Sequence, residues 1–388
     1  MDARVRTNGR RQRGSCGWLP STLGLAGLGL LASSACGTGR IVPTSPDELR
    51  SELLVRGAHE IVVPFEPDEG MRAWVHEKVP RGGSRPFRLQ ALAEGLLSEG
   101  GLGIDYSRDL TATAPEVFEN RVANCLSFTH LFAGLAREIG IPVYFLEVRD
   151  VENYSKEGDL IVHSDHIAIG YGPEHDLTII DFAVRSGTQY RKIRAIGDLT
   201  ATALFYSNRG AEHLRHGEPV RAVRWLKSAI AIDPHLAPGW VNYGVALRRT
   251  GDAEAAERAY RRALEIDSAE YSAYQNLAAL LRMEGKEAEA LELLAIAAEA
   301  GNRNPFAYLA LGDLSMRHGR SDQAVRFYRR AVRLNDEQAE PLAALGLWEL
   351  DNGDSREAQR LLKRALRFDP RDPRVRQLSA RLGGPPGS

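Results

Sequence analysis

Small and aromatic side chains recur every 34 residues in the second half of the chain. One register consists of glycines that interrupt otherwise helical stretches, at Gly217, Gly251, Gly285, Gly319 and Gly353. Two registers of alanine follow the glycines. Two other registers precede them, one of small residues and one of mainly aromatic residues. These four are Ala222, Ala256, Ala290, Ala324 and Ala358; Ala229, Ala263, Ala297, Ala331 and Ala365; Gly210, Gly244, Ala278, Gly312 and Gly346; and Tyr206, Trp240, Tyr274, Tyr308 and Leu342. Such self-similarity predicts one supersecondary unit copied five times.

The residue types predict a pair of helices in each unit. Small residues let helix A approach its own helix B and the next helix A, and the aromatic residue fills the space above them. The glycine register supplies left-handed residues that end each helix A. Asp233-Pro234 and Asp369-Pro370 are expected to end helices B, because proline cannot continue a helix.

This pattern resembles the tetratricopeptide repeat. The resemblance covers 203–372, in five repeats at 203–236, 237–270, 271–304, 305–338 and 339–372, and leaves 373–388 as a capping helix and tail. It implies an all-α solenoid with a concave face that holds a protein or peptide ligand.

Five arginines are expected near the ends of the A helices, at Arg215, Arg248, Arg249, Arg282 and Arg317. They form either a basic stripe along a peptide groove or solvated helix ends, where cations complement the helix dipole. The carboxylate clamp known in this family wants Asn one place after the small residue. Here that place holds Ala211, Val245, Ala279, Asp313 and Leu347, so a clamp is not predicted.

The segment before the repeats predicts an α+β domain. Helices are expected over 71–79 and 86–99, and a third from Cys125, where Phe128, Phe132 and Leu135 recur at helical spacing. The stretches 143–148, 161–171 and 177–182 are rich in β-branched and aromatic residues and predict strands.

Cys125 is expected in the first turn of that third helix, where free N–H groups favour a thiolate. A cysteine nucleophile needs a histidine to take its proton and a third group to orient the histidine. His166 and Asp181 lie on or at the end of the predicted strands and could supply both.

This order of helix-Cys, strand-His and strand-Asp resembles the transglutaminase-like (papain-like) fold. Its most specific part runs from Asn124-Cys125 to Arg137-x-x-Gly140-Ile141-Pro142. The resemblance implies a domain over 65–200 with a catalytic triad of Cys125, His166 and Asp181, acting on amides through a thioester. Leu126, Ala168 and Phe182 depart from the family pattern, which bears on substrate preference. Asn124 is a candidate for the second oxyanion donor.

Each residue also has a structural explanation. Cys125 is of a type that is often simply buried, and Asp181 could only end a strand in a turn. His163 could be the base instead of His166, although on a strand the two point to opposite faces. A metal site of His163, Asp165, His166 and His175 matches no common spacing, so neither metal nor cofactor is expected.

The first 35 residues predict an export signal. Five arginines precede the apolar run from Leu23 to Ala32, and small residues follow it up to Cys36. This segment resembles a bacterial lipoprotein signal, which implies lipid attachment at Cys36 and a place on the periplasmic face of the cell envelope, at the outer membrane. Ordinary cleavage after Ala35 is the alternative. Residues 36–64 are expected to be a linker.

Fifty basic and 51 acidic side chains leave a formal net charge of −1, which argues against nucleic acid as the main partner. Membrane contact is expected only through the lipid anchor. The leading hypothesis is an exported thiol enzyme, a peptidase or acyltransferase, whose repeats bind a protein or peptide. The alternative is a non-catalytic envelope scaffold that acts through the repeats alone.

Overall fold

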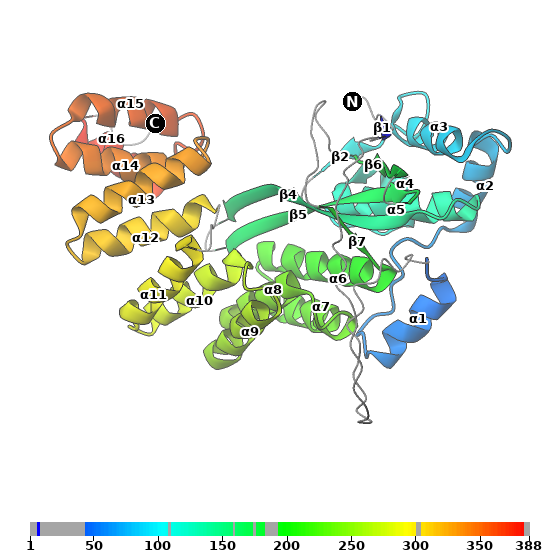
Figure 1. Ribbon diagram of the computed structural model, residues 1–388, viewed down its shortest axis with the longest axis horizontal. Helices are drawn as coiled ribbons and strands as arrows, with labels where there is room; N and C mark the ends of the chain where they lie inside the picture. Colours follow the sequence, from blue (N-terminus) through cyan, green and yellow to red (C-terminus); the bar gives the residue numbers. More distant parts are fainter. Residues whose placement is uncertain are drawn as a thin grey trace, which may run out of the picture. The chain divides into compact units, whose positions relative to one another are not determined.

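A computed structural model describes residues 6–7, 43–107, 110–157, 160–173, 176–182, 193–299 and 304–383. The chain divides into two compact units (Figure 1). Unit 1 comprises 1–49, 63–148 and 167–201, and unit 2 comprises 50–62, 149–166 and 202–388. Each unit is described by itself below.

Four helices of unit 1 begin with side chains that accept backbone hydrogen bonds. The helices are α2 (Glu69–Lys78), α3 (Arg85–Leu97), α4 (Ala114–Asn120) and α5 (Cys125–Glu138), with N-caps Asp68, Ser84, Thr113 and Asn124. A capped first turn satisfies amide groups that otherwise lack partners. The helices expected over 71–79, over 86–99 and from Cys125 are thus present.

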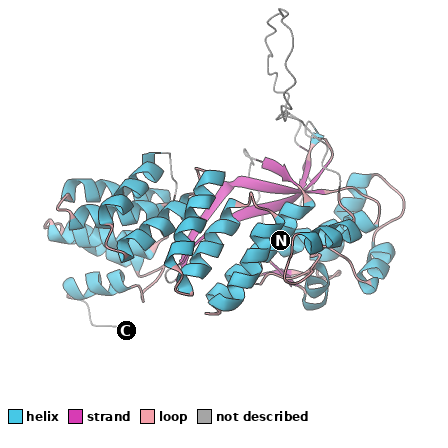
Figure 2. Ribbon diagram, turned by 90° about the horizontal axis from the view of Figure 1, so that it is seen from below, coloured by secondary structure: helices cyan, strands magenta, loops and turns pink. Residues whose placement is uncertain are grey.

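A five-stranded sheet has the order β1-β6-β5-β4-β7, and its strands stand out in Figure 2. Strands β1, β6 and β7 belong to unit 1, whereas β4 and β5 are divided between the two units at Val148 and Ile167. The strands are β1 (Arg6–Thr7), β4 (Tyr144–Glu157), β5 (Leu160–Tyr171), β6 (Thr178–Ile180) and β7 (Ile193–Ile196). Strand β4 extends well beyond the expected 143–148, and β7 was not expected. A separate parallel pair joins β2 (Asp105–Tyr106) to β3 (Val122–Ala123).

Helix α5 is the central element of the unit 1 core. Eleven of its 14 residues are buried, among them Phe132, which is completely covered. Side chains around almost the whole circumference are buried, which is typical of a helix enclosed by other elements. Cys125 therefore stands at the start of the most enclosed helix of this unit.

The end of α5 is tied to the start of α6 (Asp198–Arg215) by a buried ion pair. Arg137 donates to both carboxylate oxygens of Asp198 at 2.9 and 2.8 Å, and to the carbonyl of Val143. The Asp198 side chain is fully covered and also accepts from the Thr44 amide at 2.7 Å. Gly140 follows the helix with a φ of +76°, as a helix-ending glycine should.

Unit 2 contains the predicted helix pairs. After α6, whose residues from Thr202 belong to this unit, come α7 (Pro219–Ile232), α8 (Ala237–Arg249), α9 (Ala253–Ile266), α10 (Tyr271–Met283), α11 (Glu287–Glu299), α12 (Pro305–Arg317), α13 (Ser321–Leu334), α14 (Ala339–Asp351), α15 (Ser355–Ala365) and α16 (Pro373–Arg381). The short helix α1 (Pro46–Val55) begins in unit 1, and its last residues belong to unit 2. No described helix is long and apolar enough to cross a membrane.

The two glycine registers have different structural roles. The glycines that follow the A helices have φ values of +74°, +91°, +78°, +71° and +87°, the left-handed region in which other residues are strained. The small residues within the A helices allow close packing instead. A β-carbon at Gly244 would lie 2.5 Å from the Tyr260 ring, and one at Gly312 would lie 2.3 Å from the Tyr328 ring.

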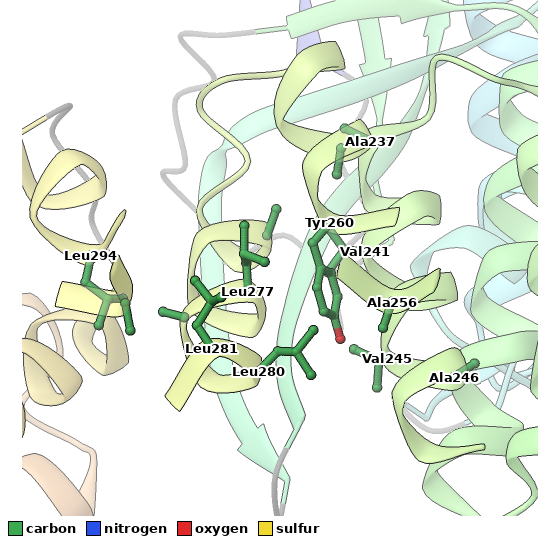
Figure 3. Packing of buried hydrophobic residues seen from close by; sticks show 14 of the residues in the cluster. Ala237, Val241, Val245, Ala246, Ala256, Tyr260, Leu277, Leu280, Leu281 and Leu294 are labelled. Carbon is green, nitrogen blue, oxygen red and sulfur yellow. The ribbon is translucent and has the colours of Figure 1, made fainter. Parts of the chain in front are cut away.

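Figure 3 shows the resulting packing around Tyr260, whose ring from α9 lies beside Val245 of α8. Leu277, Leu280 and Leu281 of α10 belong to the same buried cluster. The repeated side chains thus form one core that continues from repeat to repeat.

Residues 56–62, expected to lie in a linker, dock on the first helix pair of unit 2. The Tyr206 hydroxyl donates to the Glu60 carbonyl at 2.5 Å and accepts from the Val62 amide at 2.9 Å. The His59 amide donates to the Ser228 hydroxyl, and its ring meets Trp225 edge-on at 5.0 Å. This segment covers the open end of the stack, as terminal caps of solenoids do.

Candidate functional site

Cys125 is the first residue of α5 and is partly exposed, with a free thiol. The residue before it, Asn124, is buried, and both ends of its side chain are engaged. Its oxygen accepts from the Ser127 amide at 2.8 Å, and its nitrogen donates to the Thr111 hydroxyl at 3.2 Å. Asn124 therefore fixes the first turn of the helix, and this geometry argues against its use as an oxyanion donor.

A hydroxyl next to Cys125 links α5 to strand β5. The Thr129 oxygen lies 2.6 Å from the Cys125 carbonyl oxygen and 3.4 Å from the Ile167 carbonyl oxygen. Ile167 directly follows His166, which is half-buried on β5. Thr129, at the start of the second turn of α5, thus contacts the backbone one residue from the predicted base.

An aromatic stack links the first turn of α5 to the residue after Asp181. The rings of Phe128 and Phe182 are parallel within 8° with centroids 4.3 Å apart, and Tyr106 packs on Phe182 at 5.8 Å. Asp181 lies between this stack and β6, and is half-buried. The β5–β6 register pairs Ile169 with Ile180, so Asp181 follows on the side toward Ala168.

His130, one turn after the cysteine region of α5, is completely buried. Its ring lies between Phe65 and Phe145, with centroids 6.2 and 5.4 Å away. Burial, opposed by a hydrogen bond to the Ala201 backbone and helped by nearby Arg137, lowers the pKa of His130 to about 3. A histidine held neutral in this way contributes to the core.

A hollow of about 690 Å³ lies at the other end of α5, where its lining includes Arg72, Arg85, Arg137 and Glu138. The Arg72 guanidinium lies 3.3 Å from Glu138, and Arg137 is held by Asp198. None of Cys125, His166 and Asp181 lines this hollow, so it is separate from the predicted triad.

The five arginines expected at the A-helix ends occupy the last turns of α6, α8, α10 and α12. Arg249 donates to the Leu214 carbonyl at 2.6 Å, which satisfies the end of the preceding A helix. Arg317 lies 3.4 Å from the Glu287 carboxylate. Arg249 has a structural role in this arrangement.

Arg282 differs from these because, in the described part of the chain, its guanidinium has neither a hydrogen bond nor an ion pair within 4 Å. Partial burial, together with repulsion by nearby Arg317, lowers the pKa of Arg282. Met283 and Met316 stand beside these two arginines and are 71% and 38% exposed. Cationic and apolar side chains are thus combined at the ends of α10 and α12.

Two structurally important residues lay outside the predicted site. Asp198 fixes the end of α5, and Phe182 carries the stack next to Asp181. Phe182 was noted only as a departure from the transglutaminase pattern. Nothing in the sequence near Asp198 marks its partner 61 residues away, so only the structure could find it. Cys36 lies outside the described residues.

Two family models described as tetratricopeptide repeat match this chain, one over residues 213–281 and the other over 284–340 and 309–373. Among solved structures, PilF of Pseudomonas aeruginosa is similar at 21% identity over 48% of this chain and 84% of that chain, with a TM-score of 0.43. MamA of Desulfovibrio magneticus RS-1 is similar at 22% identity over 44% of this chain and 97% of that chain (TM-score 0.34). A tetratricopeptide-repeat protein of Thermus thermophilus is similar at 19% identity over 46% and 98% (TM-score 0.39). A search of the curated proteins found no match.

The helix pairs over the matched ranges are therefore tetratricopeptide repeats, as the 34-residue period predicted. Solenoids of this class generally bind protein or peptide partners. Neither match reaches residues before 213, so the transglutaminase-like assignment stays a prediction from the Cys125, His166 and Asp181 pattern.

Proposed function

We propose that this protein is a binding scaffold that recognises another polypeptide through its tetratricopeptide repeats. The observation that carries this proposal is the exposed surface at the ends of α10 and α12. Arg282 and Arg317 lie close enough to repel each other, and the flexible side chains of Met283 and Met316 stand beside them. Adaptable apolar side chains among cations suit a partner segment that carries both carboxylates and apolar residues.

A site-specific crosslinker tests this proposal. Placed at Met283 of the full-length protein in its host cell, a photoreactive residue should give a discrete adduct with one partner polypeptide. The adduct should weaken when Arg282→Gln and Arg317→Gln are added. The matched control position is Arg258 on α9, whose side chain is 71% exposed. Equal adducts from both positions, or adducts unaffected by the two Gln substitutions, would contradict the proposal.

A second candidate function is acyl transfer by Cys125, His166 and Asp181. It is favoured by the contacts of the first five residues of α5, which touch Ile167 and Phe182, the neighbours of His166 and Asp181. In this reaction the Cys125 thiolate attacks an amide carbonyl carbon and forms a C–S bond. The C–N bond then breaks, and His166, protonated by the thiol, gives that proton to the leaving amine.

Water or a second amine would next attack the thioester carbonyl. His166 would accept its proton and return it to the Cys125 sulfur as the C–S bond breaks, leaving a carboxylic acid or a new amide. Asp181 would orient the His166 ring. The geometry leaves the second oxyanion donor unassigned, because the Asn124 amide is engaged with Thr111.

The reactivity of the thiol tests this second candidate. Mass spectrometry can follow iodoacetamide labelling of Cys125 at pH 6–7, peptide by peptide. An active dyad predicts faster labelling than of a model thiol and a lower rate in His166→Ala, with His76→Ala, an exposed histidine of unit 1, as the matched control. Labelling at the rate of a model thiol in every variant would exclude the enzyme and leave the scaffold.

Export with lipidation at Cys36 is proposed on the leader sequence alone. Metabolic labelling with a radioactive fatty acid should mark the mature protein and should fail in Cys36→Ser. An unlabelled mature chain that begins at Cys36 would instead identify ordinary cleavage after Ala35.

A further inference from the structure

The outward faces of the B helices carry very different charges, although they occupy equivalent positions of the repeat. On α9, three arginines pair with three glutamates. Arg258 lies 3.9 Å from Glu254, Arg261 lies 2.7 Å from Glu257, and Arg262 lies 2.9 Å from Glu265. This face is therefore neutral and locally compensated.

The carboxylates of α9 are mostly replaced in the fourth and fifth repeats. Position 68 residues after Glu257 holds Val325, which is buried in the core, and position 102 residues after it holds Gln359, which is exposed. The exposed positions 68 and 102 residues after Glu265 hold Arg333 and Arg367. Across the six equivalent positions, α9 has three Arg and three Glu, a net charge of zero. The same positions hold four Arg and one Asp in the fourth repeat, a net of +3, and five cations without a carboxylate in the fifth.

Several of these cations have no counter-charge. Arg329, Arg360 and Arg364 pair with Glu349, Glu357 and Asp336. Six further cations on or just after α13 and α15 have no ion pair within 4 Å to any residue in the described ranges, and one of them, Arg330, lies over the Tyr308 ring, 5.7 Å from its centroid. The other five, called the basic ridge below, are Arg326, Arg333, Arg356, Lys363 and Arg367. All five are exposed, and both helices pack against α14.

Two large apolar side chains stand at the end of the basic ridge. Leu366 and Phe368, on either side of Arg367, are each 43% exposed. Uncompensated cations next to exposed Leu and Phe are the combination by which peripheral proteins bind the headgroup region of a bilayer. The formal net charge of the whole protein is −1, so attraction to an anionic surface would have to come from a local patch.

We propose that the basic ridge, with Leu366 and Phe368, is a contact surface for an anionic phospholipid bilayer. This surface is independent of the scaffold function and of the candidate thiol chemistry. It adds a second membrane contact to the single lipid anchor that the leader sequence suggests. An acidic polypeptide would also match the charge, but the exposed Leu and Phe at the end of the ridge favour a bilayer interface.

The small number of lysines gives a local measurement of this contact. The chain has six Lys, and Lys363 is the one that belongs to the basic ridge. Acylation by a water-soluble succinimidyl ester, quantified by mass spectrometry, should slow severalfold at Lys363 when phosphatidylglycerol vesicles are added to the full-length protein. Phosphatidylcholine vesicles should have no such effect, and 0.5 M NaCl, on the order of a 4 Å Debye length, should reverse it. Lys227 on α7 and Lys286 before α11 serve as internal controls.

A double charge reversal tests the assignment of residues. Arg333→Glu with Arg367→Glu restores the carboxylate that α9 has as Glu265, so the repeat fold should tolerate it. Each basic residue near an anionic surface contributes about a factor of five in affinity, so vesicle-dependent protection should require at least about 25-fold more lipid. Arg81→Glu with Arg85→Glu, both exposed in unit 1, makes the same change of net charge away from the ridge and should leave Lys363 protected.

Three outcomes would overturn the proposal. Lys363 could stay fully reactive while the protein sediments with the vesicles, which would assign membrane binding to the apolar leader. Protection could persist in the Arg333→Glu/Arg367→Glu variant. Polyglutamate could protect Lys363 where phosphatidylglycerol vesicles do not, which would identify an acidic polypeptide as the partner.

Discussion

Replacing Asp198 by Asn should strongly destabilise unit 1, because it leaves a charge buried without its partner. The Asp198 side chain is completely covered and accepts hydrogen bonds from two Arg137 nitrogens and from the Thr44 amide. The Arg137 side chain is 14% exposed, so water can compensate it only in part. Removing one member of a buried ion pair costs about 3–5 kcal/mol.

Hydrogen–deuterium exchange of the α5 amides measures this cost within unit 1 alone. Since about 1.4 kcal/mol corresponds to a factor of ten, exchange should accelerate by roughly 100-fold or more in Asp198→Asn. The matched control is Glu77→Gln, which removes an exposed pair with Lys78 and should cost less than about 1 kcal/mol. Arg137→Met with Asp198→Leu, which removes both charges, should recover much of the stability. If Asp198→Asn accelerates exchange no more than Glu77→Gln, the buried pair does not stabilise α5 and the reasoning is wrong.

Three further predictions concern the two cores. The pKa of His130 is lower in the folded protein than in the unfolded chain, so its contribution to the free energy of unfolding is retained above pH 6.5 and falls toward pH 3, by roughly 2 kcal/mol at pH 5. Urea titrations from pH 7 to 4 should show this decrease in the free energy of unfolding, and His130→Leu should reduce it. Gly312→Ala should cost about 1–3 kcal/mol by thermal denaturation, because its β-carbon would meet the Tyr328 ring, whereas Gly82→Ala, with open space around it, should be nearly neutral. Tyr206→Phe leaves the Val62 amide without its acceptor and should cost about 1–3 kcal/mol, seen as faster tryptic cleavage at Arg56; an unchanged cleavage rate would show that residues 56–62 do not need this bond.

The repeat architecture could be predicted because its signal lies in residues whose role is local and repeated. Gly251 must adopt a positive φ, and Gly244 must let the Tyr260 ring approach, and neither requirement depends on distant parts of the chain. Each requirement recurs every 34 residues, so chance agreement is excluded. The cap of the first repeat could not be predicted in this way. Tyr206 binds the backbone of Glu60 and Val62, and backbone groups leave no mark in the sequence.

The candidate thiol site was predictable to a smaller extent. Helical periodicity from Cys125 and the strands around His166 and Asp181 indicated the elements correctly. The role of Asn124 as a helix cap was missed. An asparagine just before a helix can serve either as a cap or as an oxyanion donor, and the residue type is the same in both cases. Only its hydrogen bonds separate the two roles.

The repeats also separate positions that are constrained by packing from positions that are free to acquire a function. Ala256, Ala324 and Ala358 are completely buried at one register, and the same residue type is kept in each because the space around it is the same. Three residues after each of these alanines, positions 259, 327 and 361 also pack inward. Later in the same repeats, positions 265, 333 and 367 face outward, and there the residue changes from Glu to Arg. Packing does not require that change, since Glu265 is accommodated in an equivalent helix. A charge that differs between repeats of one fold is therefore evidence about what those repeats meet outside the fold, and this is the reason to look for a partner at the basic ridge.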